Sequence, residues 1–516
     1  MNRDAMRAAA EDGTHDVLVI GGGATGLGLA VDAASRGWRT VLLEAEDLAK
    51  GTSSRSTKLV HGGVRYLEQL DFSLVMEALR ERGLMARNAP HLVHHLRFVV
   101  PRYSWWEGPF YGVGLKLYDA LAGKLNLAPS RSLGREQTVA AIPNVHLDGL
   151  LGGTEYHDGQ FDDARMAVAL ARTAVEHGAA LVTRCRVTGL LRESGRVVGA
   201  EFVDQLTGRS GRVRARVTMN ATGIWSDEVR RMEDPAAPAM VEPAQGVHLV
   251  LPASFAPGGN AIMVPHTDDG RVLFVIPWHG RVLVGTTDTP MPRAELEPRP
   301  LPEEVEFILR NAARYLERQP TRADVLSAFA GQRPLVHPGG TSGTTKSVSR
   351  RHEVVTSAGG LVSVMGGKWT IYRKMAEDGL AHAAEVGGLE PRPCVTESLR
   401  LHGWSDSPVQ GWGGVFGAEA AEVERFLRQT KGWEAPMHPR LELPLGLAAW
   451  AARNEMALGV EDVLARRTRA LLLDARAAME AAEPVARVLA AELGRDGAWV
   501  ADEVARFAAL ARGYLP

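Results

Sequence analysis

The pattern of hydrophobic and polar positions changes once along the chain, near residue 390. Before that point, short apolar runs alternate with glycine turns and helical stretches, which is typical of α/β and α+β proteins. After it, apolar residues recur at helical spacing with charges between them, as in 419–429, 460–478 and 483–493. The pattern predicts an α/β body and a separate helical C-terminal domain, with a hinge in the Pro- and Gly-rich stretch 387–393.

The first apolar run, Asp16–Ile20, is of the buried-strand type, and a glycine cluster that fits G-x-G-x-x-G follows it directly. Leu27–Arg36 then has the pattern of a helix and Thr40–Glu44 that of a second strand. Because the N–H groups and the dipole at a helix N-terminus favour anions, this unit predicts a dinucleotide pyrophosphate bound at the turn. The residues predicted to contact it are Gly21, Gly23, Ala24, Thr25 and Gly26.

An acidic residue, Glu44, ends the second strand, where it can accept a hydrogen bond from a ribose hydroxyl. This argues against NADP but does not separate NAD from FAD. Three later segments favour FAD, since they offer hydroxyls, backbone donors and a helix start for a flavin. The cofactor-binding residues predicted in them are Thr52, Ser53, Ser54, Ser56, Thr57 and Lys58, then Ala221 and Gly223, and finally Gly366, Gly367, Lys368, Trp369 and Thr370.

Composition excludes several classes of protein. The 59 Lys and Arg residues nearly balance the 61 Asp and Glu residues, which gives no electrostatic case for binding nucleic acid. Cys185 and Cys394 form no CxxC pair, so neither a metal site nor a disulfide framework is expected. The first 13 residues lack an apolar signal region, and no uncharged apolar run reaches membrane-spanning length. We therefore expect a cytoplasmic protein without a transmembrane helix.

The stretch 103–118 is densely aromatic, with Arg102, Lys116 and Lys124 in or beside it. Trp and Tyr favour the membrane interface because one end of each side chain is apolar and the other is polar. A loop and helix packed on the core, or a dimer contact, would have the same composition. Both interpretations remain open on composition alone.

The segment from His61 to Tyr66, with Gly62, Gly63 and Arg65 between, is the best candidate for catalytic chemistry. A histidine titrates near neutral pH and can take a hydroxyl proton, and an arginine can hold phosphate through two parallel N–H bonds. The two glycines would let a ligand approach the backbone closely, so His61 and Gly62 are also predicted to contact the cofactor. A turn in which these side chains bond only locally is the alternative.

Together these segments resemble the FAD-dependent glycerol-3-phosphate dehydrogenases. The matching sequences are IGGGATGLG, EAEDLAKGTSSRSTKLVHGGVRYLE, NATGIWSDE, LFVIPWHG, VGTTDT, GQRPL and VMGGKWTIYRKMAE, with EDVLARRT in the tail similar to the family's C-terminal cap. The resemblance implies an α/β fold of the amino-acid-oxidase type. A Rossmann-type FAD-binding domain (12–85, 151–240 and 352–390) is interleaved with an α+β substrate domain that has an antiparallel sheet (86–150 and 241–351), and a helical cap follows (391–516).

The resemblance also implies a reaction, the oxidation of sn-glycerol 3-phosphate to dihydroxyacetone phosphate by hydride transfer from C2 to FAD. His61 is then the candidate base, and Lys368 stabilises the alkoxide or the reduced flavin. The predicted catalytic residues are His61, Arg65, Arg333 and Lys368, and the predicted substrate contacts are Arg65, Tyr66, Arg333, Arg350 and Thr286. The family has one arginine where this chain has Arg350 and Arg351, so the choice of Arg350 is open.

The chain departs from the family pattern at Gln245-Gly-Val-His248, where Lys-Gly-Ser-His is expected. His248 matches that pattern, and it is either a second candidate base or a core histidine.

The family implies a membrane quinone as electron acceptor, which would favour peripheral attachment through 103–118 to the inner face of the cell membrane. A homodimer is a family-level expectation. One alternative is a soluble oxidase that uses O₂, although this chain shows no obvious room for the inserted segment of such relatives. A non-catalytic flavin-binding regulator is the other alternative, and the presence of His61, Arg65, Arg333 and Lys368 weighs against it.

Overall fold

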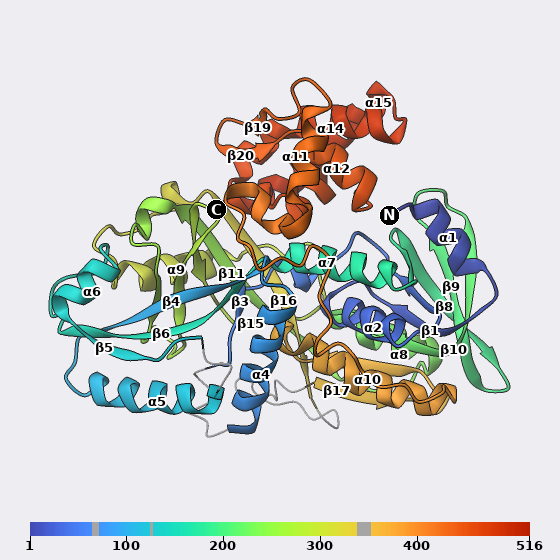
Figure 1. Ribbon diagram of the computed structural model, residues 1–516, viewed down its shortest axis with the longest axis horizontal. Coiled ribbons are helices and arrows are strands. Elements are labelled where there is room, and N and C mark those ends of the chain that lie inside the picture. The colour runs from blue at the N-terminus through green and yellow to red at the C-terminus, as the bar shows by residue number, and fades with distance from the viewer. Residues whose placement is uncertain (64–71, 124–126, 338–351) are drawn as a thin grey trace.

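The computed structural model describes residues 1–63, 72–123, 127–337 and 352–516, which form two large β-sheets and a helical C-terminal domain (Figure 1). In the first sheet, β1 pairs in parallel with β2 and β10, β2 with β7, and β10 with β18, while β8, β9 and β17 add antiparallel pairs. Its strands are β1 (Thr14–Ile20), β2 (Thr40–Leu43), β7 (Ala180–Val182), β8 (Cys185–Glu193), β9 (Arg196–Asp204), β10 (Ser210–Asn220), β17 (His352–Thr356) and β18 (Val362–Gly366).

Strand β1 lies at the centre of this sheet because its apolar residues are buried between neighbours on both sides. Val17 lies opposite Thr40 of β2 and Val217 of β10, and both Val17 and Val19 are fully buried. Helix α2 (Ala24–Ser35) follows the glycine turn and packs against helices α7 (Asp163–Glu176) and α10 (Tyr372–Gly387). The predicted strand, turn, helix and second strand are thus confirmed, and the unit is of the Rossmann type.

The second sheet is mostly antiparallel and is held together by the long pairing of β11 with β16, from Val241 opposite Val336 to Val250 opposite Ser327. Its strands are β3 (Leu59–Val60), β4 (Val93–Arg102), β5 (Arg131–Gly134), β6 (Gly152–Phe161), β11 (Val241–Pro252), β12 (Ala261–Val264), β13 (Leu273–Trp278), β14 (Arg281–Gly285), β15 (Thr289–Pro290) and β16 (Ser327–Val336). Strand β6 pairs in this sheet with β3, β4 and β5. The domain boundaries given above stay a prediction.

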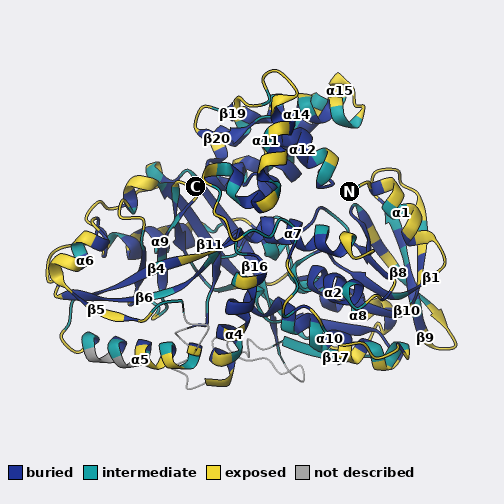
Figure 2. Cartoon of the chain, in the orientation of Figure 1, coloured by how far each residue is buried: buried dark blue, intermediate teal, exposed yellow. Residues whose placement is uncertain are grey.

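Helices cover both sheets, and the strands beneath them are largely buried (Figure 2). Besides α2, α7 and α10, the helices of the body are α1 (Arg3–Glu11), α4 (Phe72–Asn88), α5 (Glu107–Ala122), α6 (Arg135–Ala141), α8 (Ser226–Glu233) and α9 (Pro302–Ala313). Short 3₁₀ turns are η1 (Thr52–Ser54), η3 (Gly223–Trp225), η4 (Ala253–Phe255), η5 (Arg322–Asp324) and η7 (Trp369–Ile371).

The C-terminal domain lies above both sheets in Figure 1, on the side of the molecule opposite α5. Its helical elements are η8 (Gly411–Glu419), α11 (Ala420–Arg428), α12 (Leu447–Asn454), the π-helical turn η9 (Asp462–Arg467), α13 (Ala470–Leu473), α14 (Ala475–Leu493), α15 (Gly497–Ala511) and η10 (Arg512–Tyr514). The domain is helical as predicted, with two features that the sequence pattern did not show. One is the hairpin of β19 (Pro436–His438) and β20 (Leu441–Pro444), and the other is the left-handed Arg469, which divides 460–478.

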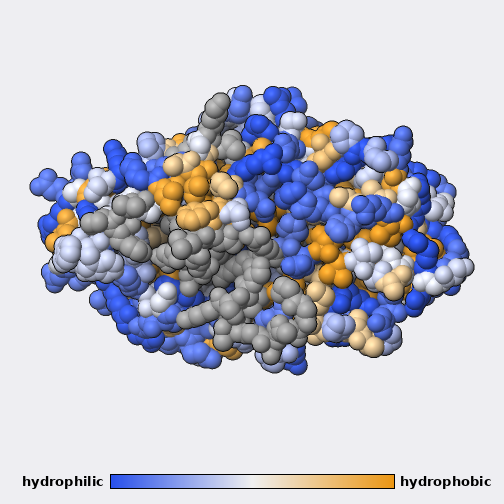
Figure 3. Space-filling model, turned by 90° about the horizontal axis from the view of Figure 1, so that it is seen from below, coloured by the Kyte–Doolittle hydropathy of each residue, from blue (hydrophilic) through white to orange (hydrophobic). Residues whose placement is uncertain are grey.

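Exposed apolar side chains gather on helices α4 and α5, on the face that Figure 3 shows. Ten large hydrophobic residues of the described chain are exposed, and five of them belong to these helices or to the turn before α5, namely Phe72, Met76, Trp105, Trp106 and Leu117. Among the described residues, no helix combines the length and the apolarity needed to cross a bilayer. The five exposed side chains of α4, α5 and the turn between β4 and α5 form the apolar cluster considered below.

Candidate functional site

A cavity of about 810 Å³ is lined by residues of the second sheet, of helix α5, of the loop after β2 and of the turn after β18. This volume is within the usual range for ligand sites, about 300–1,000 Å³. The predicted site residues in its wall are Thr52, Ser56, Thr57, His61, Thr286, Arg333, Gly367, Lys368, Trp369 and Thr370. Arg65, Tyr66 and Arg350 fall outside the described residues. The other predicted residues do not line the cavity.

The glycine turn has no room for side chains at two positions. Gly21 has a φ of +108°, and a Cβ there would lie 2.6 Å from the carbonyl oxygen of Ala221. A Cβ on Gly26 would lie 1.8 Å from the carbonyl oxygen of Gly21. Helix α2 begins at Ala24, so Gly23, Ala24, Thr25 and Gly26 form its open first turn. This packing lets the backbone approach a pyrophosphate closely, as a dinucleotide site requires.

The loop after β2 is attached to this turn by three hydrogen bonds. The Glu44 carboxylate accepts a hydrogen bond from the N–H of Gly22 at 2.5 Å. Within the loop itself it also accepts one from the N–H of Glu46 at 2.6 Å. Ala49 N–H donates to the Gly22 carbonyl at 3.0 Å, and Ala24 N–H donates to Ser53 Oγ at 2.9 Å. Burial raises the pKa of Glu44, against the effect of the two N–H donors. A carboxylate has about four acceptor positions, so Glu44 keeps capacity for a ribose hydroxyl.

Three residues predicted to bind the cofactor are engaged within the protein. Lys58 is fully buried, and its ammonium donates to the Ser54 carbonyl at 2.6 Å and to the Asp163 carboxylate at 2.7 and 2.8 Å. The N–H and hydroxyl of Ser56 donate to the same carboxylate at 3.0 and 2.7 Å. These bonds fasten the loop to the start of α7, and a direct role in cofactor binding stays a prediction for Ser54, Ser56 and Lys58.

His61 lines the cavity, and the backbone next to it is held by a buried network that the sequence analysis missed. Gly62 N–H donates to Tyr118 Oη at 2.8 Å, and Tyr118 donates to Asp158 at 2.7 Å. Arg82 donates to the other oxygen of Asp158 at 3.0 Å. Burial and the charge of Asp158 keep the pKa of Tyr118 well above its usual value, so its hydroxyl stays a donor. No distinct sequence signal marked this network, because Asp158 lies in a strand that is rich in glycine and polar residues.

Arg333 lies in β16 and lines the cavity. Its guanidinium donates to Asp288 at 3.2 Å, to Thr286 Oγ1 at 3.2 Å and to the Thr287 carbonyl at 3.2 Å. A Cβ on Gly246 would come within 2.2 Å of this guanidinium, so the glycine of the altered Gln-Gly-Val-His segment makes room for it. Thr286 and Arg333 thus act as one polar unit.

His248 is a buried histidine that also reaches the cavity wall. Its Nε2 lies 2.9 Å from Thr57 Oγ1, and its ring stacks on Phe329 with centroids 5.1 Å apart. Burial, with the nearby charges of Arg333 and Lys58, holds the pKa of His248 well below its ordinary value. The ring is therefore neutral at neutral pH.

Two adjacent left-handed glycines, Gly366 and Gly367, have φ values of +73° and +72° and turn the chain from β18 into η7 and α10. Lys368 follows them and lines the cavity, and Trp369 Nε1–H donates to the Ser53 carbonyl at 2.9 Å. This bond joins the turn to the loop that reaches the glycine cluster. Gly223 similarly has a φ of +59° at the start of η3, just after Ala221.

Comparison with known proteins gives a consistent result. A family model of FAD-dependent oxidoreductases matches residues 16–373, and a model of the C-terminal domain of alpha-glycerophosphate oxidase matches residues 362–499. A mitochondrial glycerol-3-phosphate dehydrogenase of Mesocricetus auratus is 41% identical over 93% of this chain and 70% of its own length. One from Arabidopsis thaliana is 40% identical over 95% of this chain and 84% of its own length.

Solved structures agree. A glycerol-3-phosphate dehydrogenase from Bacillus halodurans in complex with FAD superposes with a TM-score of 0.82 at 29% identity, covering 100% of this chain and 98% of that one. The L-alpha-glycerophosphate oxidase of Mycoplasma pneumoniae shares the fold at a TM-score of 0.57 and 16% identity, over 75% of this chain and 98% of that one.

The fold and the glycine turn define an FAD-dependent oxidoreductase. Within that class the chain belongs to the FAD-dependent glycerol-3-phosphate dehydrogenase family. Its cofactor is FAD, and the resemblance seen in the sequence is confirmed. The chain fits this cofactor, since the turn at Gly21 and Gly26 is closed to side chains and the loop bonded to it through Ser53 continues into the cavity wall at Thr52.

Replacement of Gly26 tests the turn. The Gly26→Ala variant must displace the Gly21 carbonyl, so FAD affinity should fall by at least about tenfold. The flavin-to-protein absorbance ratio of the purified variant measures this. Gly497→Ala is the control, because a Cβ there meets nothing within 4 Å. A Gly26→Ala protein with a full complement of FAD would contradict the prediction.

Removal of the Tyr118 hydroxyl tests the network behind His61. Tyr118→Phe leaves Gly62 N–H and Asp158 without this partner, and we expect kcat/KM to fall about tenfold while FAD content is kept. Tyr103→Phe is a matched control, because it removes a hydroxyl bonded to the His146 carbonyl outside the cavity wall. Equal steady-state kinetics in the two variants would show that the network does not position His61.

Proposed function

We propose that this protein oxidises sn-glycerol 3-phosphate to dihydroxyacetone phosphate, with C2 of the substrate as hydride donor. FAD, when bound, would supply the two-electron chemistry that this oxidation needs. The observation that carries the proposal is one cavity lined by His61, Arg333 and Lys368, beside segments suited to a dinucleotide. The family to which the chain belongs supports the same reaction.

The chain's own residues would bind and orient a small phosphorylated alcohol. Arg333, with Thr286 beside it, presents N–H donors for the alcohol oxygen or the phosphate. Lys368 lies in the same wall and would offset negative charge that develops on oxygen. Arg65, Tyr66 and Arg350 are proposed as further substrate contacts on the resemblance alone.

His61 is the better of the two candidate bases. His248 is buried, its Nε2 is engaged with Thr57, and its lowered pKa makes it a weak proton acceptor. A general base works best when its pKa is near the operating pH. We therefore assign proton removal to His61 and the support of Thr57 to His248.

We further propose that the electrons pass to a membrane quinone and that the protein is peripheral on the inner face of the cell membrane. Helix α5 supports this proposal, because Tyr111, Leu115 and Leu117 line the cavity while Leu117 and the preceding Trp105 and Trp106 are exposed. Interfacial aromatic residues attach proteins to bilayers without spanning them. A homodimer remains a family-level proposal.

Anaerobic titration tests the reaction itself. Glycerol 3-phosphate should bleach the flavin absorbance of the holoenzyme, and no bleaching would favour a non-catalytic flavin protein. Arg333→Gln should raise the concentration needed for half-reduction by about 10- to 100-fold, because a charge-assisted contact is lost. Arg293→Gln, a change at an exposed arginine outside the cavity wall, is the control.

The electron acceptor is tested by reoxidising the reduced enzyme with a short-chain quinone or with oxygen. Fast reduction of the quinone with little peroxide is expected. Stoichiometric peroxide that does not respond to quinone would instead identify an oxidase.

Membrane attachment is tested at Trp105, which is 82% exposed, and Trp106, which is 43% exposed. The double variant Trp105→Ser and Trp106→Ser should bind anionic phospholipid vesicles at least about tenfold more weakly, since each tryptophan loses a large apolar contact. Vesicle co-sedimentation measures the affinity. Leu206→Ser, at an exposed leucine beyond β9, is the control. Unchanged binding of the tryptophan variant would place the contact elsewhere.

A further inference from the structure

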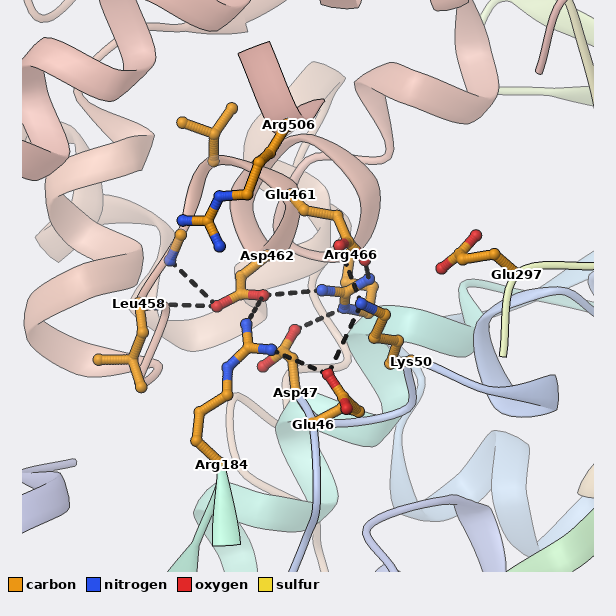
Figure 4. A network of polar contacts seen from close by, with 12 residues as sticks. Glu46, Asp47, Lys50, Arg184, Glu297, Leu458, Glu461, Asp462, Arg466 and Arg506 are labelled. Atoms are coloured by element: carbon orange, nitrogen blue, oxygen red, sulfur yellow. Dashed lines mark hydrogen bonds and ion pairs between the residues drawn. The ribbon is translucent and has the colours of Figure 1, made fainter. Parts of the chain in front are cut away.

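The loop that follows β2, residues 44–55, has two attached sides. Its inner side is bonded to the glycine turn through Glu44, Ala49 and Ser53, as described above. Its outer side meets the C-terminal domain in a network of charged side chains, where Glu46, Asp47 and Lys50 face Glu461 and its neighbours (Figure 4). The loop therefore lies between the predicted cofactor turn and the C-terminal domain.

Asp47 is the most buried of the loop residues that pair with the C-terminal domain, and its side chain is only 1% exposed. Arg466 donates to its carboxylate at 2.5 Å, and Arg467 donates to both of its oxygens at 2.7 and 2.8 Å. Burial acts to raise the pKa of Asp47, but the charges of Arg467 and Arg466 outweigh burial and hold it well below its usual range. Two cations of the C-terminal domain thus bind one anion of the loop.

A second tie joins Lys50 to Glu461 at 3.0 Å, with side chains 10% and 19% exposed. Arg466 contacts the same Glu461 at 2.7 Å and Asp462 at 2.8 Å. Arg184 closes the network, since it reaches Asp462 at 2.6 Å and Glu46 at 3.3 Å.

Eight charged groups at the centre of this network balance, and Arg186 and Glu455 pair with two of them at its edge. The four central carboxylates and four central cations are Glu46, Asp47, Glu461 and Asp462 with Lys50, Arg184, Arg466 and Arg467. Separating the loop from the domain would leave buried charges without partners, which is strongly unfavourable.

The far end of the loop is also reached by the C-terminus. Arg55, which lines the cavity, pairs with Glu297 at 2.7 Å, and Tyr514 donates to the same carboxylate at 3.2 Å. At this end the C-terminus is linked to the loop through Glu297, which accepts from both Arg55 and Tyr514.

We propose that the C-terminal domain retains the cofactor by holding loop 44–55 against the glycine turn. Glu44, Thr52 and Ser53 are carried on this loop, so its displacement would remove several predicted FAD contacts together. Lys50, Asp47 and their partners are positioning residues in this account. They act on FAD through the loop and not by touching substrate. The proposal concerns release of FAD and does not depend on which alcohol is oxidised.

The test is the rate of FAD release from the holoenzyme, followed by the rise in free-flavin fluorescence well below the unfolding temperature. Lys50→Gln and Glu461→Gln should each release FAD about tenfold faster. The double variant should be no faster than Glu461→Gln alone, because Lys50 and Glu461 form one ion pair while Glu461 also pairs with Arg466. Lys50→Arg keeps the charge and should restore slow release.

The matched control is Glu419→Gln. Glu419 pairs with Arg172 of α7 at 2.8 Å, with side chains 15% and 17% exposed, and so ties the C-terminal domain to the body away from the loop. This variant should release FAD at the parent rate even if its melting temperature falls as much. Faster release from Glu419→Gln as well, or parent release rates in Lys50→Gln and Glu461→Gln, would overturn the proposal. Because no substrate is used, neither result depends on the proposed reaction.

Discussion

The parallel pairing of β1, β2, β10 and β18 is the constraint on which the site depends. Parallel strands place their carboxyl ends at one edge of the sheet, and that edge is where open α/β sheets bind ligands. The glycine turn follows β1, Glu44 follows β2, Ala221 follows β10, and Gly367 follows β18. Segments far apart in the chain therefore meet at one edge of the sheet because of backbone pairing.

The second sheet supplies charged and polar side chains to the cavity wall. Strand β16 carries Arg333 and strand β11 carries Gly246, so a guanidinium enters the cavity wall where its neighbour has no side chain. The buried trio of Arg82, Tyr118 and Asp158 then fixes the backbone beside His61 from behind. The first sheet thus contributes the glycine turns, and the second sheet contributes polar side chains to the cavity wall.

Sequence patterns predicted those turns and element ends whose geometry depends only on neighbouring residues. The turn at Gly21–Gly26, the strand to Glu44 and the helix start after Gly366 and Gly367 follow from glycine spacing and apolar periodicity, and each lies where it was predicted. The resemblance to a family added the substrate and the candidate roles of His61 and Arg333 in its oxidation.

Long-range polar pairs could not be predicted in this way. Asp47 and Arg467 are about 420 residues apart, and Arg82 and Asp158 are 76 apart, so neither pair leaves a periodic signal. The ion pair of Lys58 was missed for the same reason. The lysine's position in a hydroxyl-rich segment indicated a cofactor contact, whereas in the fold its charge is neutralised by Asp163. A lysine's neighbours in sequence do not reveal whether an acidic partner lies beneath it.

The balanced charge network around Asp47 also affects how the molecule responds to heat. Hydration of charged groups becomes less favourable as temperature rises, so the cost of keeping such pairs out of water falls, while apolar stabilisation levels off. Four carboxylates and four cations at one contact therefore make the attachment of the C-terminal domain comparatively insensitive to warming. An apolar contact of similar extent would gain less from the same rise in temperature.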